Sequence, residues 1–306
     1  MGIVKTGIKR RTRLLREILR PPKPGSLAHR SATPTATVAT VRKPLRERRR
    51  KRPPKRITAL TYTVPPASRL VESPVFVLAP VRSGSTLLRM LLNSHPRIRA
   101  PHELHLRAIG VNLVPGYSVR AMRGIDLDQA ELEHVLWDRV LSLELERSGK
   151  ELIADKTPGN VWAWERLRYA WPKARFLILL RHPEGIVSSL ENGMPNASRS
   201  AIQRNVLKYF VPLEKAQRTL DCLTVRYEDL TADPEAVTRQ VCAYLGQEWD
   251  PVMLDYGAQD HGPLRHNLGD CSEKIRSGSV QPARPVSGID ALSPKLRAFA
   301  SAWGYV

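Results

Sequence analysis

The chain has 306 residues, and 49 Lys and Arg side chains against 29 Asp and Glu give it a formal net charge of +20. Residues 1–56 hold 19 of the basic and 2 of the acidic side chains, which leaves residues 57–306 close to neutral. A neutral body of this length can bury one large core, and it argues against a chain that binds nucleic acid over its whole surface. Three cysteines without CxxC or CxxH spacing argue against a disulfide-built miniprotein and a structural zinc site. No apolar run approaches the ~20 residues of a membrane-spanning helix.

The basic end of the chain has the composition of a disordered tail. Aliphatic and basic side chains alternate over residues 1–20, prolines follow at positions 21, 22 and 24, and residues 46–52 are almost all Arg or Lys. Such a segment buries too little apolar surface to offset the entropy of ordering it. We therefore predict a basic, largely disordered tail over residues 1–60 and a single domain over residues 70–306.

The charge of residues 1–56 allows two functional interpretations beside that of a solubilising extension. One is contact with a membrane surface, and the other is non-specific contact with a polyanion. We expect no specific nucleic-acid partner. We expect a cytoplasmic protein, peripheral to a membrane where the tail binds one.

Short apolar runs alternate with helical patterns from residue 74 onward. The predicted strands are residues 74–79, 151–154, 175–180 and 223–225, and the predicted helices are residues 86–93, 126–147, 198–220 and 234–245, with one more beginning over residues 184–190. Continuous apolar runs such as 175–180 are typical of strands buried on both faces of a parallel sheet. The alternation predicts an α/β fold with a doubly wound, mainly parallel sheet and helices on both faces. From residue 259 to 293 we expect a long irregular segment.

The loop Ala79–Thr86, between the first strand and helix, has the spacing of a P-loop: a small residue, four others, then Gly84 and two hydroxyls. Such a loop turns its backbone amides and the helix N-terminus toward an anion. The lysine that reaches the phosphates of a triphosphate is absent, because Ser85 takes its place, which argues against ATP or GTP. Arg82 supplies a cation instead. The alternative interpretation is an ordinary tight turn.

The segment Val77–Leu88 resembles the 5′-phosphosulfate loop of sulfotransferases that use 3′-phosphoadenosine 5′-phosphosulfate (PAPS), in the branch that has Arg in this loop and includes tyrosylprotein and many bacterial sulfotransferases. The resemblance continues, in order, at Asn93–Pro96, Asp155–Pro158, Leu179–Pro183 with Ser188 and Ser189, and Arg226–Leu230. These blocks cover roughly residues 74–250. The resemblance implies a P-loop-type fold and transfer of the sulfuryl group from PAPS to an acceptor hydroxyl, which yields PAP and a sulfate ester.

The resemblance also implies a set of residues that bind the nucleotide. The phosphosulfate would be held by the loop residues Arg82, Ser83, Gly84, Ser85 and Thr86. Arg181 and Ser189 match the residues that bind the 3′-phosphate, and a guanidinium with a hydroxyl suits that group. Ser188, the residue before Ser189, is the alternative hydroxyl for binding the 3′-phosphate. Tyr227 matches a tyrosine near the adenine, or is a core aromatic.

Three residues are the candidates for catalysis. Arg82 would stabilise charge on the leaving phosphate. Glu103 matches the catalytic glutamate of the tyrosylprotein branch, and we expect partial burial to raise the pKa of its carboxyl so that it acts as a base near neutral pH. His102 and His105 are the alternatives. Lys156 would face the sulfuryl group or the acceptor; the alternative is a lysine exposed to solvent.

The sequence leaves the acceptor open: a small molecule, a carbohydrate, a lipid or a peptide tyrosine. We expect residues 104–148 and 191–215 to shape its pocket. PAPS is the expected co-substrate, and no metal is expected because arginine and backbone amides can neutralise a single 5′-phosphate. The alternative functions are a P-loop nucleotide kinase-like phosphotransferase and a polyanion-binding protein that uses the basic tail.

Overall fold

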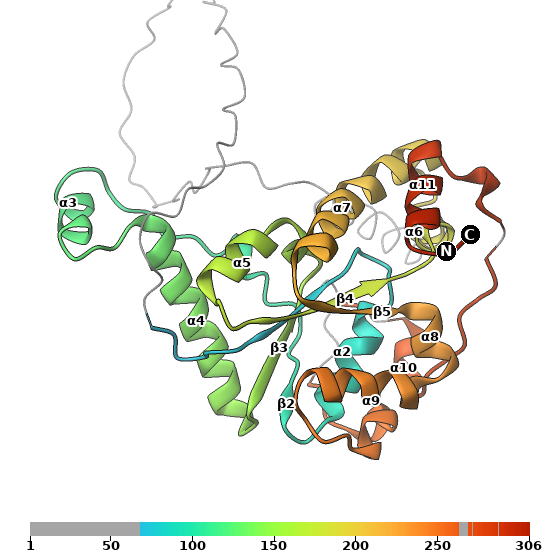
Figure 1. Cartoon of the computed structure of the whole chain (residues 1–306), viewed down its shortest axis with the longest axis horizontal. Helices are drawn as coiled ribbons and strands as arrows, with labels where there is room; N and C mark the ends of the chain where they lie inside the picture. Colours follow the sequence, from blue (N-terminus) through green and yellow to red (C-terminus); the bar gives the residue numbers. More distant parts are fainter. Residues whose placement is uncertain (1–67, 263–268, 271, 287) are drawn as a thin grey trace, which may run out of the picture.

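The computed structural model describes residues 68–262, 269–270, 272–286 and 288–306, and these build a five-stranded parallel sheet in the order β2-β3-β1-β4-β5 (Figure 1). The strands are β1 (Val75–Leu78), β2 (Ile98–Arg99), β3 (Leu152–Lys156), β4 (Arg175–Leu180) and β5 (Cys222–Arg226). The helices are α2 (Ser85–Ser94), α3 (Tyr117–Arg123), α4 (Gln129–Ser148), α5 (Trp164–Ala170), α6 (Pro183–Gly193), α7 (Arg199–Thr219), α8 (Tyr227–Ala232), α9 (Pro234–Tyr244), α10 (Glu273–Arg276) and α11 (Pro294–Ala302). Short 3-10 turns include η1 (Leu106–Ala108) and η2 (Pro158–Trp162).

The sheet is buried on both faces, and this explains its continuous apolar strands. Along β1, Phe76 and Leu78 pack into one core cluster with α4, α5, α6, α7 and α11. Val75 and Val77 point the other way, into a second cluster with α2, α8 and α9. Successive side chains of a strand alternate between faces, so one run of apolar residues serves both clusters. The predicted doubly wound α/β fold is confirmed.

The parallel register brings the chemically informative segments to one edge of the sheet. The P-loop follows β1, Lys156 is the last residue of β3, Arg181 follows β4, and Tyr227 follows β5. Lys156 is level with Val77 of β1, and Arg226 is level with Leu180 of β4. In open α/β sheets, ligands bind outside the carboxyl ends of the strands. The four segments that are separate in the sequence therefore meet at the edge where a ligand is expected.

The structure also differs from the sequence prediction at several boundaries. Helix α4 begins at Gln129 because the Asp128 carboxylate accepts a hydrogen bond from the Glu131 amide at 2.7 Å, so Asp128 and not Asp126 is the cap. Strand β3 extends to Lys156, two residues beyond the predicted end. The sequence patterns do not predict five elements: the two-residue strand β2, the short helices α3 and α5, helix α8 and helix α11. Helix α8 follows β5 without a loop. The predicted irregular segment 259–293 contains the short helix α10.

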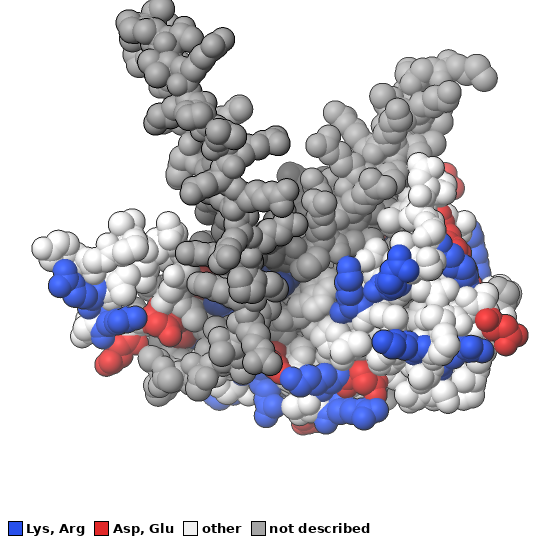
Figure 2. Space-filling model, turned by 90° about the horizontal axis from the view of Figure 1, so that it is seen from above, with Lys and Arg blue, Asp and Glu red and all other residues white. Residues whose placement is uncertain are grey.

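The described surface carries mixed charge. Lys and Arg lie among Asp and Glu on the face shown in Figure 2, as the near-neutral composition of the domain predicts. Within the described ranges no helix is both long and apolar enough to cross a bilayer. The predicted tail, residues 1–60, falls within residues 1–67, which lie outside the described residues.

Candidate active site

The P-loop takes the tight conformation that its glycine predicts. Gly84, with φ of 88°, is the cap residue of α2, and a Cβ at this position would lie 2.2 Å from the ring of Tyr227. Only glycine fits both the left-handed backbone and this close approach. The Ser83 hydroxyl is buried and donates to the Pro80 carbonyl at 2.7 Å. Its side chain therefore closes the loop, and only its backbone amide remains for a ligand, which narrows the predicted role of Ser83.

The two predicted phosphate sites adjoin each other. The Arg82 Nε donates to the Ser189 hydroxyl at 3.0 Å, and Arg181 Nη1 donates to the backbone carbonyl of Arg82 at 2.8 Å. Ser188 is turned away, because its hydroxyl donates to Glu184 at 2.8 Å. The geometry therefore favours Ser189 over its neighbour.

Arg181 is a half-buried cation. Its guanidinium lies 4.4 Å from the centroid of the Tyr227 ring, and burial lowers the pKa of Arg181 from its ordinary value. In the described ranges, no carboxylate forms an ion pair with it. An arginine held in this way beside a P-loop is suited to bind an anionic group. Tyr227 is both a buried aromatic and a wall of the loop, so its two interpretations are compatible.

One residue that the sequence analysis did not predict also lies at the loop. The Asp270 carboxylate is 3.2 Å from Arg82 Nη1, and the Asp270 amide donates to the Thr86 hydroxyl at 3.0 Å. Asp270 comes from the segment predicted to be irregular, where no strand or helix pattern indicates which residues approach the sheet. The Asp270 carboxylate would therefore compete with a bound anion for Arg82.

Glu103 is buried and lies between a lysine and a histidine. Its Oε1 accepts from Lys156 Nζ at 2.5 Å, and its Oε2 is 3.4 Å from His105 Nε2. Burial raises the pKa of Glu103, but the charge of Lys156 and the hydrogen bonds from His105 and Lys156 outweigh it, so the pKa lies below its ordinary value. The predicted upward shift is therefore wrong. Lys156 is 1% exposed, which excludes the solvated alternative.

The turn that presents Glu103 is fixed by a second polar cluster from β3 and η2. The Thr157 hydroxyl accepts from the His105 amide at 3.2 Å and donates to Asp155 at 3.0 Å. Asn160 donates to the other oxygen of Asp155 at 2.9 Å. His105 has a φ of 52°, a conformation that a non-glycine residue keeps only when its surroundings hold it. The Thr157 and Asp155 pair supplies that restraint.

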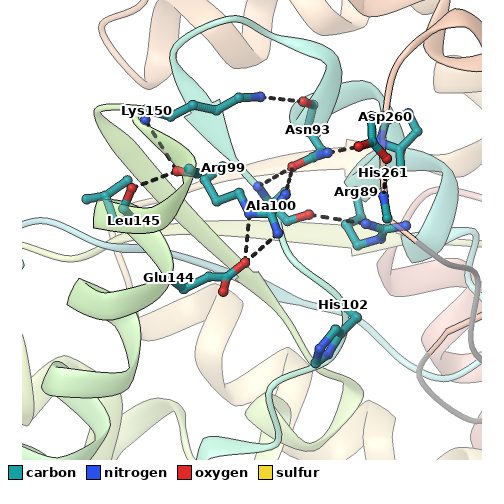
Figure 3. Close-up of polar contacts among 12 residues, drawn as sticks. Arg89, Asn93, Arg99, Ala100, His102, Glu144, Leu145, Lys150, Asp260 and His261 are labelled. Carbon is teal, nitrogen blue, oxygen red and sulfur yellow. Dashed lines mark hydrogen bonds and ion pairs between the residues drawn. The ribbon is translucent and has the colours of Figure 1, made fainter.

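The segment that leads to Glu103 is tied to α2 and α4 (Figure 3). Asn93 accepts from the Ala100 amide at 2.9 Å, Arg89 donates to the Ala100 carbonyl at 3.2 Å, and Arg99 donates to Glu144 at 2.8 Å. His102 is exposed and its Nδ1 lies 3.2 Å from the backbone carbonyl of Glu103. Of the three candidate bases, Glu103 and His105 are thus in side-chain contact, whereas His102, within the described ranges, has a polar contact with the backbone alone.

Comparison with known proteins agrees with this geometry. The chain is 27% identical over 216 residues to the nodulation protein NoeE of Sinorhizobium fredii, covering 58% of this chain and 51% of that protein. It is 25% identical over 241 residues to protein-tyrosine sulfotransferase 2 of Gallus gallus, covering 72% of this chain and 62% of that protein. The chain therefore spans between about half and two thirds of the length of these two relatives.

Solved structures show the same fold. The sulfotransferase domain of the Synechococcus PCC 7002 olefin synthase matches with a TM-score of 0.62 at 23% identity, covering 79% of this chain and 98% of that one. The sulfotransferase domain of the curacin biosynthetic pathway matches with a TM-score of 0.57 at 22% identity, covering 78% and 99%. The model of the sulfotransferase family matches residues 74–251, which hold the P-loop, Glu103, Lys156, Arg181 and Tyr227. The chain belongs to the sulfotransferase family.

Proposed function

We propose that this protein transfers the sulfuryl group of PAPS to a hydroxyl of its acceptor. The observation that carries the proposal is that Arg181, a half-buried arginine without an ion-pair partner among the described residues, and Ser189 both lie at a P-loop that lacks the triphosphate-binding lysine. This arrangement suits a nucleotide with a 5′-phosphosulfate and a separate 3′-phosphate. Membership of the sulfotransferase family supports the same conclusion.

The residues present fit such a co-substrate. Gly84 leaves room for a backbone turn that any side chain would block, and Ser85 and Thr86 begin α2 at its N-terminus. Loop amides and a helix N-terminus favour an anion, and Arg82 adds a full charge. PAPS brings an activated sulfuryl group, and the loop and Arg82 hold and neutralise the phosphate that leaves. The nucleotide kinase-like alternative is disfavoured, because the P-loop lacks the lysine that reaches the phosphates of a triphosphate.

On the acceptor side, Glu103 is the proposed general base. With its pKa below the ordinary value, its carboxylate is ionised at neutral pH and in the form that accepts the proton of an acceptor hydroxyl, although the shift lowers its strength as a base. Lys156 holds the carboxylate in place and carries a positive charge beside the reacting groups. The Thr157 and Asp155 cluster keeps the turn in position, so that little reorganisation is needed.

Nucleotide selectivity is the first test. We expect the protein to bind PAP more tightly than ADP, because Arg181 and Ser189 are available for a 3′-phosphate. Arg181→Ala should weaken PAP by about 1.5–3 kcal/mol, the usual contribution of hydrogen bonds to a charged group, and should change ADP binding little. Isothermal titration calorimetry measures both affinities. Arg239→Ala, an exposed arginine on α9, is the matched control. Equal affinities of the wild-type protein for ADP and PAP would refute the 3′-phosphate site.

Dependence on metal is the second test. Arg82 and Arg181 supply the positive charge that a magnesium ion provides in triphosphate enzymes, so turnover with labelled PAPS should be unchanged in excess EDTA. Transfer to hydroxylated acceptors is followed as labelled sulfate ester. Loss of activity on chelation, with recovery on adding magnesium, would contradict the proposed charge neutralisation.

A further inference from the structure

An arginine four residues after Glu103 has no acidic partner among the described residues. Arg107, in η1, is half-buried, and burial lowers the pKa of its guanidinium. Its contact in the described part of the chain is the face of Trp162, 5.5 Å from the ring centroid, and no carboxylate there forms an ion pair with it. A partly desolvated guanidinium without an anion is unfavourable unless a ligand completes its pairing.

A buried phenol contacts the same tryptophan. Tyr209, on α7, is 1% exposed, and its hydroxyl is one of three buried side-chain polar atoms in the described ranges that lack a hydrogen-bond partner. Buried polar groups are nearly always hydrogen-bonded, so an unpaired hydroxyl points to a missing partner. Burial and the negative charge of Glu103 both raise the pKa of Tyr209 well above its ordinary value, so the group is an O–H donor at neutral pH.

Trp162 joins the two residues. Its ring centroid is 4.4 Å from that of Tyr209, and its indole N–H donates to the Lys208 carbonyl at 3.0 Å, which fixes η2 against α7. Arg107 follows the Glu103 turn by four residues, and Trp162 follows Lys156 by six. Both chain segments therefore run from the Glu103–Lys156 pair to this cluster. The charge of Glu103 raises the pKa of the Tyr209 hydroxyl, and the charge of Arg107 lowers it.

We infer that Arg107, Tyr209 and Trp162 form the subsite that binds a carboxylate of the acceptor, while Glu103 takes the proton of the acceptor hydroxyl. This inference rests on the proposed function. One guanidinium and one neutral O–H match the two oxygens and the single charge of a carboxylate, and the guanidinium fork fits that planar group. A phosphate, with more charge, would leave part of its charge unmatched here. The negative charge of Glu103 does not oppose this assignment, because the ammonium of Lys156 pairs with it.

Matched acceptor pairs test the inference. Each pair presents the same hydroxyls with and without the negative charge: 4-hydroxyphenylacetate against 4-hydroxyphenylacetamide, and glucuronate against glucuronamide. With labelled PAPS, we expect kcat/KM to be at least ~10-fold higher for the carboxylate members, as hydrogen bonds to a charged group provide. Arg107→Gln should remove this preference and leave the neutral members almost unchanged. Tyr209→Phe should reduce it in the same direction.

Two controls separate the inference from the function on which it rests. Arg218→Gln changes an exposed arginine on the same helix as Tyr209 and should keep the preference. Affinity for PAP, measured by calorimetry, should be the same in all variants. Three results, each with PAP binding intact, would overturn the subsite and leave the proposed function standing. The first is equal kcat/KM for both members of each pair, and the second is no transfer to either carboxylate. The third is an equal loss of kcat/KM on both members in Arg107→Gln. A wild-type protein that neither binds PAP nor transfers sulfate would contradict the proposed function itself.

Discussion

Replacing Glu103 by glutamine should lower kcat at least ~100-fold and leave the affinity for PAP almost unchanged, because general-base catalysis contributes about that factor. Glutamine keeps the length of the side chain, and its amide oxygen can still accept the hydrogen bond from Lys156. It cannot take a proton from the acceptor. The measurement is turnover with labelled PAPS under saturating conditions, together with calorimetry of PAP.

The pH dependence of turnover supports the assignment independently. Since the pKa of Glu103 lies below its ordinary value of about 4.3, wild-type turnover should stay level through neutral pH and fall only in acid. A histidine base would in general lose activity as the pH falls below about 6.5. Glu144→Gln, which alters a carboxylate paired with Arg99 on α4, is the control and should remain active. Near-normal turnover in Glu103→Gln with none in His102→Ala would assign the base to the histidine.

Local patterns were sufficient to predict most of the fold. The run 175–180 is strand β4 in full, because a strand covered on both faces is apolar at every position. The P-loop was equally clear, because its spacing and its glycine act within one short segment. The short helices α5 and α8 were missed because tertiary packing, more than their own sequence, determines them.

The candidate site was predictable only in part, because its energetics depend on residues far apart in the chain. Burial of Glu103 could be anticipated, but its partner Lys156 is 53 residues away, and that pairing reverses the direction of the pKa shift. Asp270 meets Thr86 across 184 residues, from a segment without any regular pattern. Arg107 and Tyr209 fall within the two ranges expected to shape the acceptor pocket. Only the fold shows that they converge on Trp162.

Replacing Lys156 by methionine should destabilise the domain by ~3–5 kcal/mol at neutral pH, the usual cost of leaving one member of a buried ion pair without its partner. Methionine keeps much of the volume of the lysine stem and so leaves little cavity. The loss of stability should therefore come mainly from the unpaired charge of Glu103. In the wild-type protein the folded-state pKa of Glu103 is lowered, and its contribution to stability is present above its unfolded pKa and lost in acid. In the variant, burial without Lys156 should raise that pKa. The stability of the variant should then fall as the pH rises, whereas the contribution of Glu103 in the wild-type protein increases with pH.

The difference in melting temperature between Lys156→Met and the wild-type protein should therefore be largest near pH 7 and shrink in acid, as the carboxyl of Glu103 becomes neutral in both proteins. Adding Glu103→Gln to Lys156→Met should recover much of the lost stability, because the double variant buries neither charge. Lys173→Met, which removes an exposed lysine paired with Glu72, should melt close to the wild-type temperature at every pH. A Lys156→Met deficit that is independent of pH, or that persists undiminished in the double variant, would mean that lysine packing and not its charge stabilises the site. The ion pair would then not be what lowers the pKa of the proposed base.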